Sequence, residues 1–308
     1  MRSLQPLELM EPGPELEAAR RVVRAALAED VGREDVTTQA LVPPTARARG
    51  AIVARESGVL AGVPFVALVF EELAPGTVRM QVRCPEGQAF AAGEPLVRLE
   101  GAARTLLTGE RLALNLLQRL AGIATLTRRF VEAVAGTGVA IYDTRKTTPG
   151  LRALEKYAVR CGGGVNHRMG LFDQALIKDN HLAVLARRQG VALAELDLAP
   201  AVAAIRARRP GCFIEVEVAE LPALERVVAA APDAILFDNF PPEALREAVA
   251  HAVRLAEVHG VRRPVLEASG GITLATARAY AETGVDRLSV GALTHAARAL
   301  DLALDLDA

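Results

Sequence analysis

The segment Ala-Ile-Leu-Phe-Asp, residues 234 to 238, is a short apolar run that ends in a carboxylate, and it decides the fold class of this chain. An amphipathic stretch, Pro242 to His259, follows it, and a second apolar run, Val265 to Ser269, comes next. Strand, helix and strand in this order predict a parallel sheet with helices packed against it.

Outward from this unit the same alternation extends over residues 138 to 291. The further predicted strands are Val139 to Asp143, Ala175 to Asp179, Cys212 to Val218 and Arg287 to Val290. Leu221 to Ala231 and Thr273 to Thr283 are amphipathic, as helices between such strands would be. No Gly-x-Gly-x-x-Gly follows the first strand, so the pattern favours an α/β barrel over a dinucleotide-binding fold.

The first hundred residues have a different, mixed pattern. Glu15 to Glu29 has helical spacing, and the predicted strands are Arg47 to Arg55, Thr77 to Arg83 and Pro95 to Leu99. Thr108 has the character of an N-cap for a long helix that ends near Ala135. We therefore predict an N-terminal α+β domain, residues 1–128, and a barrel domain, residues 129–291. A C-terminal helix within 292–308 is expected to pack on the first domain.

Composition excludes several classes of protein. The chain has 308 residues, of which 51% are hydrophobic and 24% charged, as in a globular protein. A net charge of -1 argues against a nucleic-acid binder. The three cysteines lack metal-site spacing, which is typical of a reducing cytoplasm. Neither a signal peptide nor an apolar run of membrane-spanning length is present, so no membrane association is expected.

Cationic residues cluster at the predicted ends of the first two barrel strands and in the loop between them. In a parallel barrel such ends meet at one mouth, so these side chains are expected to bind a substrate with several negative charges. They are Arg145, Lys146, His167, Arg168 and Lys178. Arg111 falls in the first turn of the predicted long helix, where the dipole disfavours a cation. An anion is therefore expected beside it, either a ligand or a carboxylate of the chain, such as the adjacent Glu110 or another one at the surface.

Carboxylates follow on the next strands. Strict alternation from Cys212 to Val218 puts Glu215 and Glu217 on one face of an inner strand, which is costly without a compensating cation. Glu217 and Asp238, near the ends of successive strands, have the oxygen ligands that Mg²⁺ prefers. Salt bridges to arginine are the alternative explanation for these buried carboxylates.

Two glycine loops follow the last strands. Ser269-Gly270-Gly271 is expected to open a helix, and Ser289 to Gly291 is expected to open another. Backbone N–H groups at helix starts bind phosphate, and barrels often place such a site after their final strands. A tight turn from strand to helix explains the first loop equally well, but the two loops together indicate a phosphate site.

The order of these blocks resembles the quinolinate phosphoribosyltransferase family. The resemblance covers nearly the whole chain and rests on the segments that begin at Ala28, Gly109, Asp143, Asn166, Ile177, Glu215, Asp238 and Glu267. It implies an N-terminal open-faced sandwich, an incomplete α/β barrel, and a homodimer or larger oligomer with a shared active site. The implied reaction is decarboxylating phosphoribosyl transfer to quinolinate in NAD biosynthesis, with Mg²⁺ as cofactor.

The resemblance also implies a role for each site residue. Lys146, Glu217 and Asp238 are the expected catalytic residues, and Glu217 and Asp238 are the expected metal ligands. Arg145, Arg168 and Lys178 would hold the quinolinate carboxylates, and the two glycine loops would hold the 5'-phosphate. The other expected substrate contacts are Thr144, His167 and, from the neighbouring subunit, Arg111.

Three other functions fit part of the pattern. A lysine at a strand end suits a Schiff-base lyase, which would use Lys146 or Lys178. The barrel alone permits a phosphometabolite-binding module without turnover. A transferase for a pyridine acid with one carboxylate, such as nicotinate, is the nearest rival.

Overall fold

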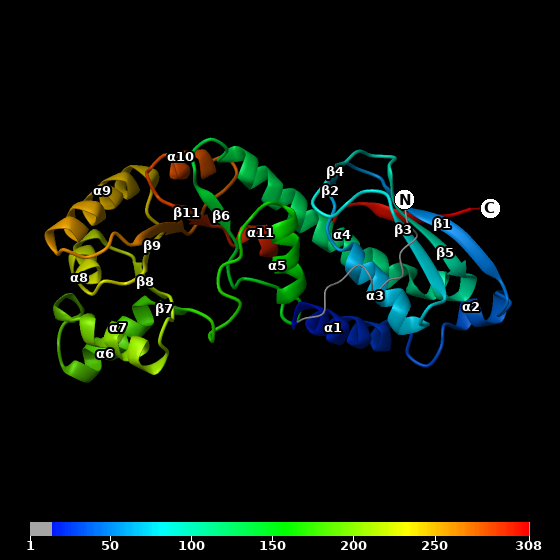
Figure 1. Cartoon of the computed structure of the whole chain (residues 1–308), viewed down its shortest axis with the longest axis horizontal. Helices are drawn as coiled ribbons and strands as arrows, with labels where there is room; N and C mark the ends of the chain where they lie inside the picture. The colour runs from blue at the N-terminus through cyan, green and yellow to red at the C-terminus, as the bar shows by residue number, and fades with distance from the viewer. Residues whose placement is uncertain (1–13, 308) are drawn as a thin grey trace. The chain divides into compact units, whose positions relative to one another are not determined.

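The computed structural model describes residues 14–307, which form two compact units (Figure 1). Of the described residues, unit 1 takes those up to Arg128, the segment Lys146–Gly164, and those from Leu293 onward. Unit 2 consists of Arg129–Arg145 and Val165–Ala292. The segment that follows the first barrel strand therefore groups with the N-terminal residues.

Unit 1 is built on an antiparallel sheet of four strands in the order β12-β1-β5-β3. The strands are β1 (Arg47–Ala54), β3 (Val78–Val82), β5 (Pro95–Ala102) and β12 (Leu302–Leu306). A second, two-stranded sheet pairs β2 (Gly58–Val59) with β4 (Ala89–Phe90). Burial alternates along β5 from Val97 to Ala102, as it does in a sheet with only one covered face.

Helices cover one face of the unit 1 sheet. Helix α3 (Val63–Leu73) contacts β3, α1 (Pro14–Asp30) contacts α3, and α5 (Arg152–Cys161) contacts α1. The other helices of the unit are α2 (Val36–Leu41) and α4 (Ala103–Ala133). Every residue from Val63 to Phe70 is buried, because α3 is apolar all round and lies inside the unit. The opposite face of the sheet carries the exposed side chains of Arg49, Arg79 and Arg98. Unit 1 is thus an open-faced α+β sandwich.

Unit 2 contains a parallel sheet of six strands in the order β6-β11-β10-β9-β8-β7. The strands are β6 (Ala140–Tyr142), β7 (Ala175–Ile177), β8 (Ile214–Val218), β9 (Ala234–Asp238), β10 (Val265–Ser269) and β11 (Arg287–Ser289). The guanidinium of Arg287 on β11 donates to Glu215 on β8 at 2.8 Å. Three strand spacings in a flat sheet would separate these residues by roughly 14 Å, so the sheet curves into an incomplete barrel.

Helices pack on the outside of this sheet. They are α6 (Asp179–Gln189), α7 (Ala199–Arg208), α8 (Leu224–Ala229), α9 (Pro242–Val258) and α10 (Ala277–Ala281). The short α11 (Ala292–His295) follows, and all of it except its first residue belongs to unit 1. Helix α9 contacts both α8 and α10, and Figure 1 draws these three on one side of the strands. Within residues 14–307 there is no helix with the length and apolar character needed to cross a membrane.

The long helix begins earlier than the sequence indicated. Strand β5 passes directly into α4 at Ala103, whose amide donates to the Ala46 carbonyl at 2.9 Å. Thr108 is therefore not an N-cap; its hydroxyl donates to Asp35 Oδ2 at 3.0 Å instead. Because Arg111 lies well beyond the first turn of α4, the argument from the helix dipole does not apply to it.

The predicted C-terminal helix is also wrong. After α11 the chain extends, and β12 pairs antiparallel with β1, with Leu302 opposite Ala54. The segment Leu-Ala-Leu-Asp-Leu, residues 302 to 306, has the period of two that suits a strand, although its composition suits a helix. The C-terminus does pack on the N-terminal residues, but as the edge of their sheet.

Candidate active site

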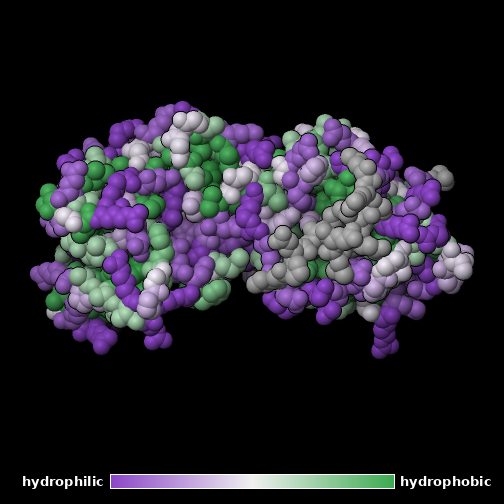
Figure 2. Space-filling view, in the orientation of Figure 1, coloured by the Kyte–Doolittle hydropathy of each residue, from purple (hydrophilic) through white to green (hydrophobic). Residues whose placement is uncertain are grey.

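The carboxyl ends of the parallel strands place most of the predicted site residues along one edge of the unit 2 sheet. In sheet order they are Thr144 and Arg145 after β6, Ser289 to Gly291 at the end of β11, Ser269 to Gly271 at the end of β10, Asp238 on β9, Glu217 on β8 and Lys178 after β7. Figure 2 shows hydrophilic side chains gathered over the part of unit 2 where Figure 1 draws β6 and β11. This edge is where barrels carry their chemistry.

Asp143 fixes the loop of residues 165–168 beside the end of β6. Its side chain is completely buried; Oδ2 accepts from Asn166 Nδ2 at 2.6 Å, and Oδ1 accepts from the His167 amide at 2.8 Å. Val165 extends the pairing as a parallel bridge to Tyr142. These contacts hold the backbone of the loop that carries His167 and Arg168 against the strand that leads to Arg145.

Two arginines are brought together at this corner. Burial first, and the charge of Arg145 second, lower the pKa of Arg168 from its ordinary value. The charges of Glu215 and Asp173 oppose this lowering in part. Like charges in a desolvated setting repel each other, and a nearby anion reduces the repulsion. A bound carboxylate would relieve this repulsion, so the corner suits a multiply charged anion.

Lys178 and Glu217 form an ion pair with each other. Lys178 follows β7, Glu217 is on the adjacent β8, and their side chains are 44% and 9% exposed. The sequence placed them in contact with different parts of the substrate and did not predict this pair. The pair supplies the cation that the nearly buried Glu217 requires.

Asp238 is held by the loops that follow β9 and β10. It lies opposite Ser269 in the strand register, and its Oδ2 accepts from Asn239 Nδ2 at 2.8 Å. The Asn239 amide donates to the Ser269 carbonyl at 2.9 Å. Gly270 has a φ of +96°, and a Cβ at this position would collide with the Asn239 side chain. Glycine is therefore required for the two loops to fit together.

The glycine loops do not open helices of useful length. After Gly271, the Thr273 amide donates to Thr276 Oγ1 at 3.0 Å, and this local turn delays α10 to residues 277–281. Helix α11 has only four residues. The expected helix dipoles are thus largely missing. Ser269 and Ser289 are nevertheless register partners, so the loops are neighbours and can offer backbone N–H groups to one phosphate.

A buried ion cluster lies on the inner side of the sheet. Glu215 and Glu267 are both completely buried, and Arg287 is paired with each of them. His167 Nε2 lies 3.0 Å from Glu215 Oε2 and 3.6 Å from Glu267 Oε1. The alternative of an arginine salt bridge is therefore correct for Glu215. Arg287 and Glu267 were missed, although an arginine that begins an inner strand was the available signal.

The two carboxyls of this cluster differ in protonation. Burial would raise the pKa of Glu215, but the hydrogen bond with His167, together with the charge and hydrogen bond of Arg287, holds it below its ordinary value. Burial and the charge of Glu215 raise the pKa of Glu267 to about 7. A pair whose pKa values are pushed apart in this way carries less net charge than two carboxylates, which lowers the cost of burying it.

Replacing Glu267 with glutamine is expected to flatten the pH dependence of stability. A carboxyl with a raised pKa in the folded chain contributes stability that is complete below its ordinary value of 4.5 and is lost as the pH rises towards 7. Urea unfolding measures the free energy of unfolding of both proteins. The difference between wild type and variant should change by an amount on the order of 3 kcal/mol across this pH window. If the free energy of unfolding depends on pH in the same way in both proteins, the raised pKa of Glu267 is contradicted. Glu282→Gln, at an exposed site, is the control.

Two sets of residues have the donors for a metal. His167, Glu215 and Glu267 each offer one ligand atom, all within 4.8 Å of one another. Arg287 already neutralises both of these carboxylates, so a cation there would have to displace it. Glu217 and Asp238, on the adjacent strands β8 and β9, offer only oxygen donors at the loop edge. This second set fits Mg²⁺, which takes one or two carboxylates and completes its shell with water and phosphate.

Arg111 belongs to unit 1, on α4, and its side chain is exposed. Among residues 14–307 it has no ion pair, so in the described part of the chain Glu110 does not supply the anion that was expected. Lys146 also belongs to unit 1 and is exposed, and its carbonyl accepts from Thr294 Oγ1 at 2.7 Å.

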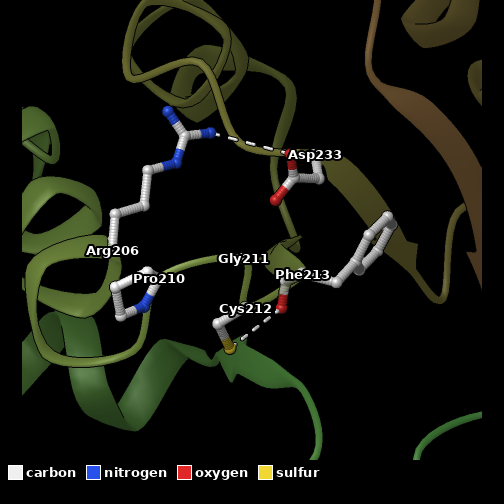
Figure 3. A pocket seen from close by; sticks show the side chains of 6 residues that line it. All are labelled: Arg206, Pro210, Gly211, Cys212, Phe213 and Asp233. Carbon is white, nitrogen blue, oxygen red and sulfur yellow. Dashed lines mark hydrogen bonds and ion pairs between the residues drawn. The ribbon is translucent and has the colours of Figure 1, made fainter.

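A cavity of about 420 Å³ lies at the opposite, amino end of the unit 2 strands (Figure 3). Arg206, Cys212, Phe213 and Asp233 line it, and Arg206 faces Asp233 across 3.7 Å. Since Phe213 and Asp233 immediately precede β8 and β9, the cavity is far along the strands from Glu217 and Asp238. It is not the site that the sequence predicted.

The fold and the loop edge together define an incomplete α/β barrel with a site for strongly anionic ligands. The chain belongs to the quinolinate phosphoribosyl transferase family. The model of the family's N-terminal domain matches residues 35–121, and that of its C-terminal domain matches residues 123–305.

Individual relatives agree with the family match. The chain is 47% identical over 296 residues to a nicotinate-nucleotide pyrophosphorylase [carboxylating] of Mycobacterium leprae, covering 95% of this chain and 98% of that one. A probable enzyme of the same name from Bacillus subtilis is 40% identical over 278 residues, 90% of each chain. The solved structure of NadC from Streptococcus pyogenes superposes with a TM-score of 0.84 at 37% identity, covering 97% of this chain and 99% of that one.

Proposed function

We propose that this chain is a quinolinate phosphoribosyltransferase of NAD biosynthesis. It transfers phosphoribosyl from phosphoribosyl pyrophosphate to quinolinate and releases pyrophosphate and CO₂, which leaves nicotinate mononucleotide. The observation that carries the proposal is the loop edge of unit 2. There, cations, two carboxylates and paired glycine loops follow the strands of a chain whose full-length relatives carry this enzyme's name. Both substrates are polyanions, as this edge requires.

Different residues of the loop edge are assigned to the two substrates. Arg145 and Arg168 lie at the corner beside β6, and a planar guanidinium suits a carboxylate. We assign the quinolinate carboxylates to this corner together with Lys178, with Thr144 and His167 beside them. The glycine loops after β10 and β11 take the 5'-phosphate, and Glu217 and Asp238 face the ribose between the two groups.

The residues present suit the chemistry of the reaction. The ring nitrogen of quinolinate forms a bond to the anomeric carbon while the bond to pyrophosphate breaks, through an oxocarbenium-like state. Lys146 and neighbouring cations stabilise the charge on the departing oxygens. The alkylated ring is then an electron sink, so the adjacent carboxylate leaves as CO₂ and the ring carbon takes up a proton. No pyridoxal-type cofactor or covalent lysine is needed.

Mg²⁺ is the cofactor that we assign to Glu217 and Asp238. When bound, it would neutralise charge on the pyrophosphate. The two carboxylates would hold it directly or through water. Lys178 would compete for Glu217, because the two are ion-paired.

Product formation tests the function. The protein is incubated with phosphoribosyl pyrophosphate, Mg²⁺ and either quinolinate or nicotinate, and the nucleotide is measured by mass spectrometry. We expect nicotinate mononucleotide from quinolinate and at least about a hundredfold lower turnover of nicotinate, because one carboxylate leaves a buried cation unpaired. Equal turnover would favour a nicotinate enzyme, and no turnover of either acid would remove the proposal.

We further propose a homodimer in which Arg111 acts in the active site of the neighbouring subunit. Its exposure, and its lack of an ion pair within residues 14–307, support this role. Arg111→Ala and Lys146→Ala are each expected to be inactive. Mixed in equal amounts with subunit exchange, they should recover about a quarter of wild-type activity, since half of the dimers carry one intact site. Recovery of none, with exchange confirmed by mass, would contradict sharing.

The cytoplasmic location remains a prediction from composition. The three cysteines, Cys84, Cys161 and Cys212, are free. Burial first, and then the charge of Glu86, raise the pKa of Cys161 to about 12, so its thiol is protonated and inert at neutral pH. Free thiols of this kind are typical of proteins in a reducing compartment.

A further inference from the structure

We propose that Arg287 is a positioning residue for the quinolinate carboxylates, acting through Glu215 and His167 on Arg168. The inference rests on the proposed function and adds residues to it. Arg287 and Glu215 lie within the barrel strands, and neither belongs to the loop edge that receives the substrates. Each link of the chain between Arg287 and Arg168 is a contact between described residues.

The first link is the pairing of Arg287 with two carboxylates. Its Nη2 donates to Glu215 Oε1 at 2.8 Å, and its Nε is paired with Glu267 Oε2. The guanidinium also lies over two rings, 4.9 Å from the centroid of Tyr142 and 5.6 Å from that of Phe213. The guanidinium is therefore held in one orientation, because donors on two of its edges are engaged by carboxylates and aromatic rings lie beside its plane. The ammonium of lysine could not reproduce it.

The second link is the orientation of the His167 ring. The Nε2 atom of His167 lies 3.0 Å from Glu215 Oε2. The side-chain amide of Gln174 donates to the same oxygen at 3.1 Å. On the other side of the ring, Nδ1 accepts from the Arg168 amide at 2.8 Å. Because Nδ1 is an acceptor, the proton must be on Nε2, and the ring donates to Glu215. The ring is thereby fixed in one tautomer and one rotamer.

The third link is the backbone of Arg168. Its amide is bound by the His167 ring, and the His167 amide is bound by Asp143. Two consecutive peptide groups are therefore anchored to buried acceptors, while the Arg168 side chain lies beside Arg145. The His167 ring uses both nitrogens within the protein, so it contributes to substrate binding by holding Arg168. A displacement of one ångström in such a group is enough to weaken binding of a rigid diacid.

Glu267 completes the cluster by balancing charge. Arg287 and its two carboxyls lie almost fully out of solvent. A proton shared by this group, as the raised pKa of Glu267 indicates, keeps its net charge near zero. The cluster can therefore hold His167 without placing a strong field of its own on the loop edge.

The test is the kinetics of Arg287→Lys, with Arg263→Lys as the matched control. Arg263 is in the same unit and pairs with Asp286 at the amino end of the sheet. For Arg287→Lys we expect the KM for quinolinate to rise at least about tenfold and the KM for phosphoribosyl pyrophosphate to change less than about threefold. Arg263→Lys should leave both unchanged. Equal effects on the two KM values, or no effect on either, would overturn the proposal.

A second measurement tests the structural link without any activity. Long-range proton–nitrogen spectra distinguish the tautomers of the five histidines, and His167→Gln identifies the signal of His167. We expect the Nε2–H form alone. A proton on Nδ1 would overturn the positioning role even in an active enzyme. If wild type makes no product from quinolinate, the proposed function fails, and the tautomer still decides whether Arg287 and Glu215 hold the His167 ring.

Discussion

Replacing Lys178 with alanine is expected to lower kcat/KM for quinolinate by about 10²- to 10³-fold while the protein stays folded. Lys178 follows β7 at the loop edge and is paired with Glu217, whose side chain is only 9% exposed. The variant loses the cation that we propose for the substrate, and it leaves Glu217 without its partner. Stability should change little, by about 1 kcal/mol or less, because the Lys178 side chain is 44% exposed.

Steady-state kinetics and thermal unfolding of the same preparation separate these effects. Arg187→Ala, an exposed cation on the following helix α6, is the matched control and should retain full activity. The double variant Lys178→Ala with Glu217→Gln should be no worse than the worse single variant, since the two side chains act as a unit. A loss of less than about tenfold for Lys178→Ala would show that the pair lies outside the reacting groups.

Replacing Arg287 with methionine is expected to destabilise the fold by about 3–5 kcal/mol. The arginine is paired with Glu215 and Glu267, both completely buried, and removing it leaves two carboxyls without a cation. The loss should shrink as the pH falls, because protonation removes the uncompensated charge. Urea unfolding at several pH values measures both the loss and its pH dependence.

A triple variant distinguishes the loss of a charge partner from the loss of packing. Changing Arg287 to methionine together with Glu215 and Glu267 to glutamine removes all the ionisable groups that the arginine bridges. We expect it to recover most of the lost stability, since buried ion clusters are often replaceable by neutral groups. If this variant is as unstable as Arg287→Met alone, packing rather than charge explains the effect.

The sequence predicted the strands of unit 2 well because each is a short apolar run between amphipathic helices. All six strands lie within or at the predicted ranges, and their carboxyl ends share one edge. The secondary-structure predictions were wrong where the intrinsic preference of the residues differs from the structure that they adopt. Leu302 to Leu306 has a helical composition and pairs as a strand, and Thr108 has the chemistry of a cap but bonds to Asp35.

The candidate site was predicted by position along the chain, whereas its internal contacts were not. Strand ends place Lys178 and Glu217 in the same region, but a sequence does not show that they pair with each other. Arg287 was missed for a stronger reason. Its contact with Glu215 crosses three strand spacings and exists only because the sheet is curved. The segment of α5 likewise joins unit 1 through contacts that no local pattern encodes.

The stoichiometry of the reaction tests the central claim most directly. Quinolinate labelled with carbon-13 in the carboxylate beside the ring nitrogen is incubated with the protein, Mg²⁺ and phosphoribosyl pyrophosphate. The account predicts labelled CO₂, pyrophosphate and unlabelled nicotinate mononucleotide in equal amounts, with none when phosphoribosyl pyrophosphate is omitted. Labelled carbon retained in the nucleotide, or CO₂ released without pyrophosphate, would contradict it.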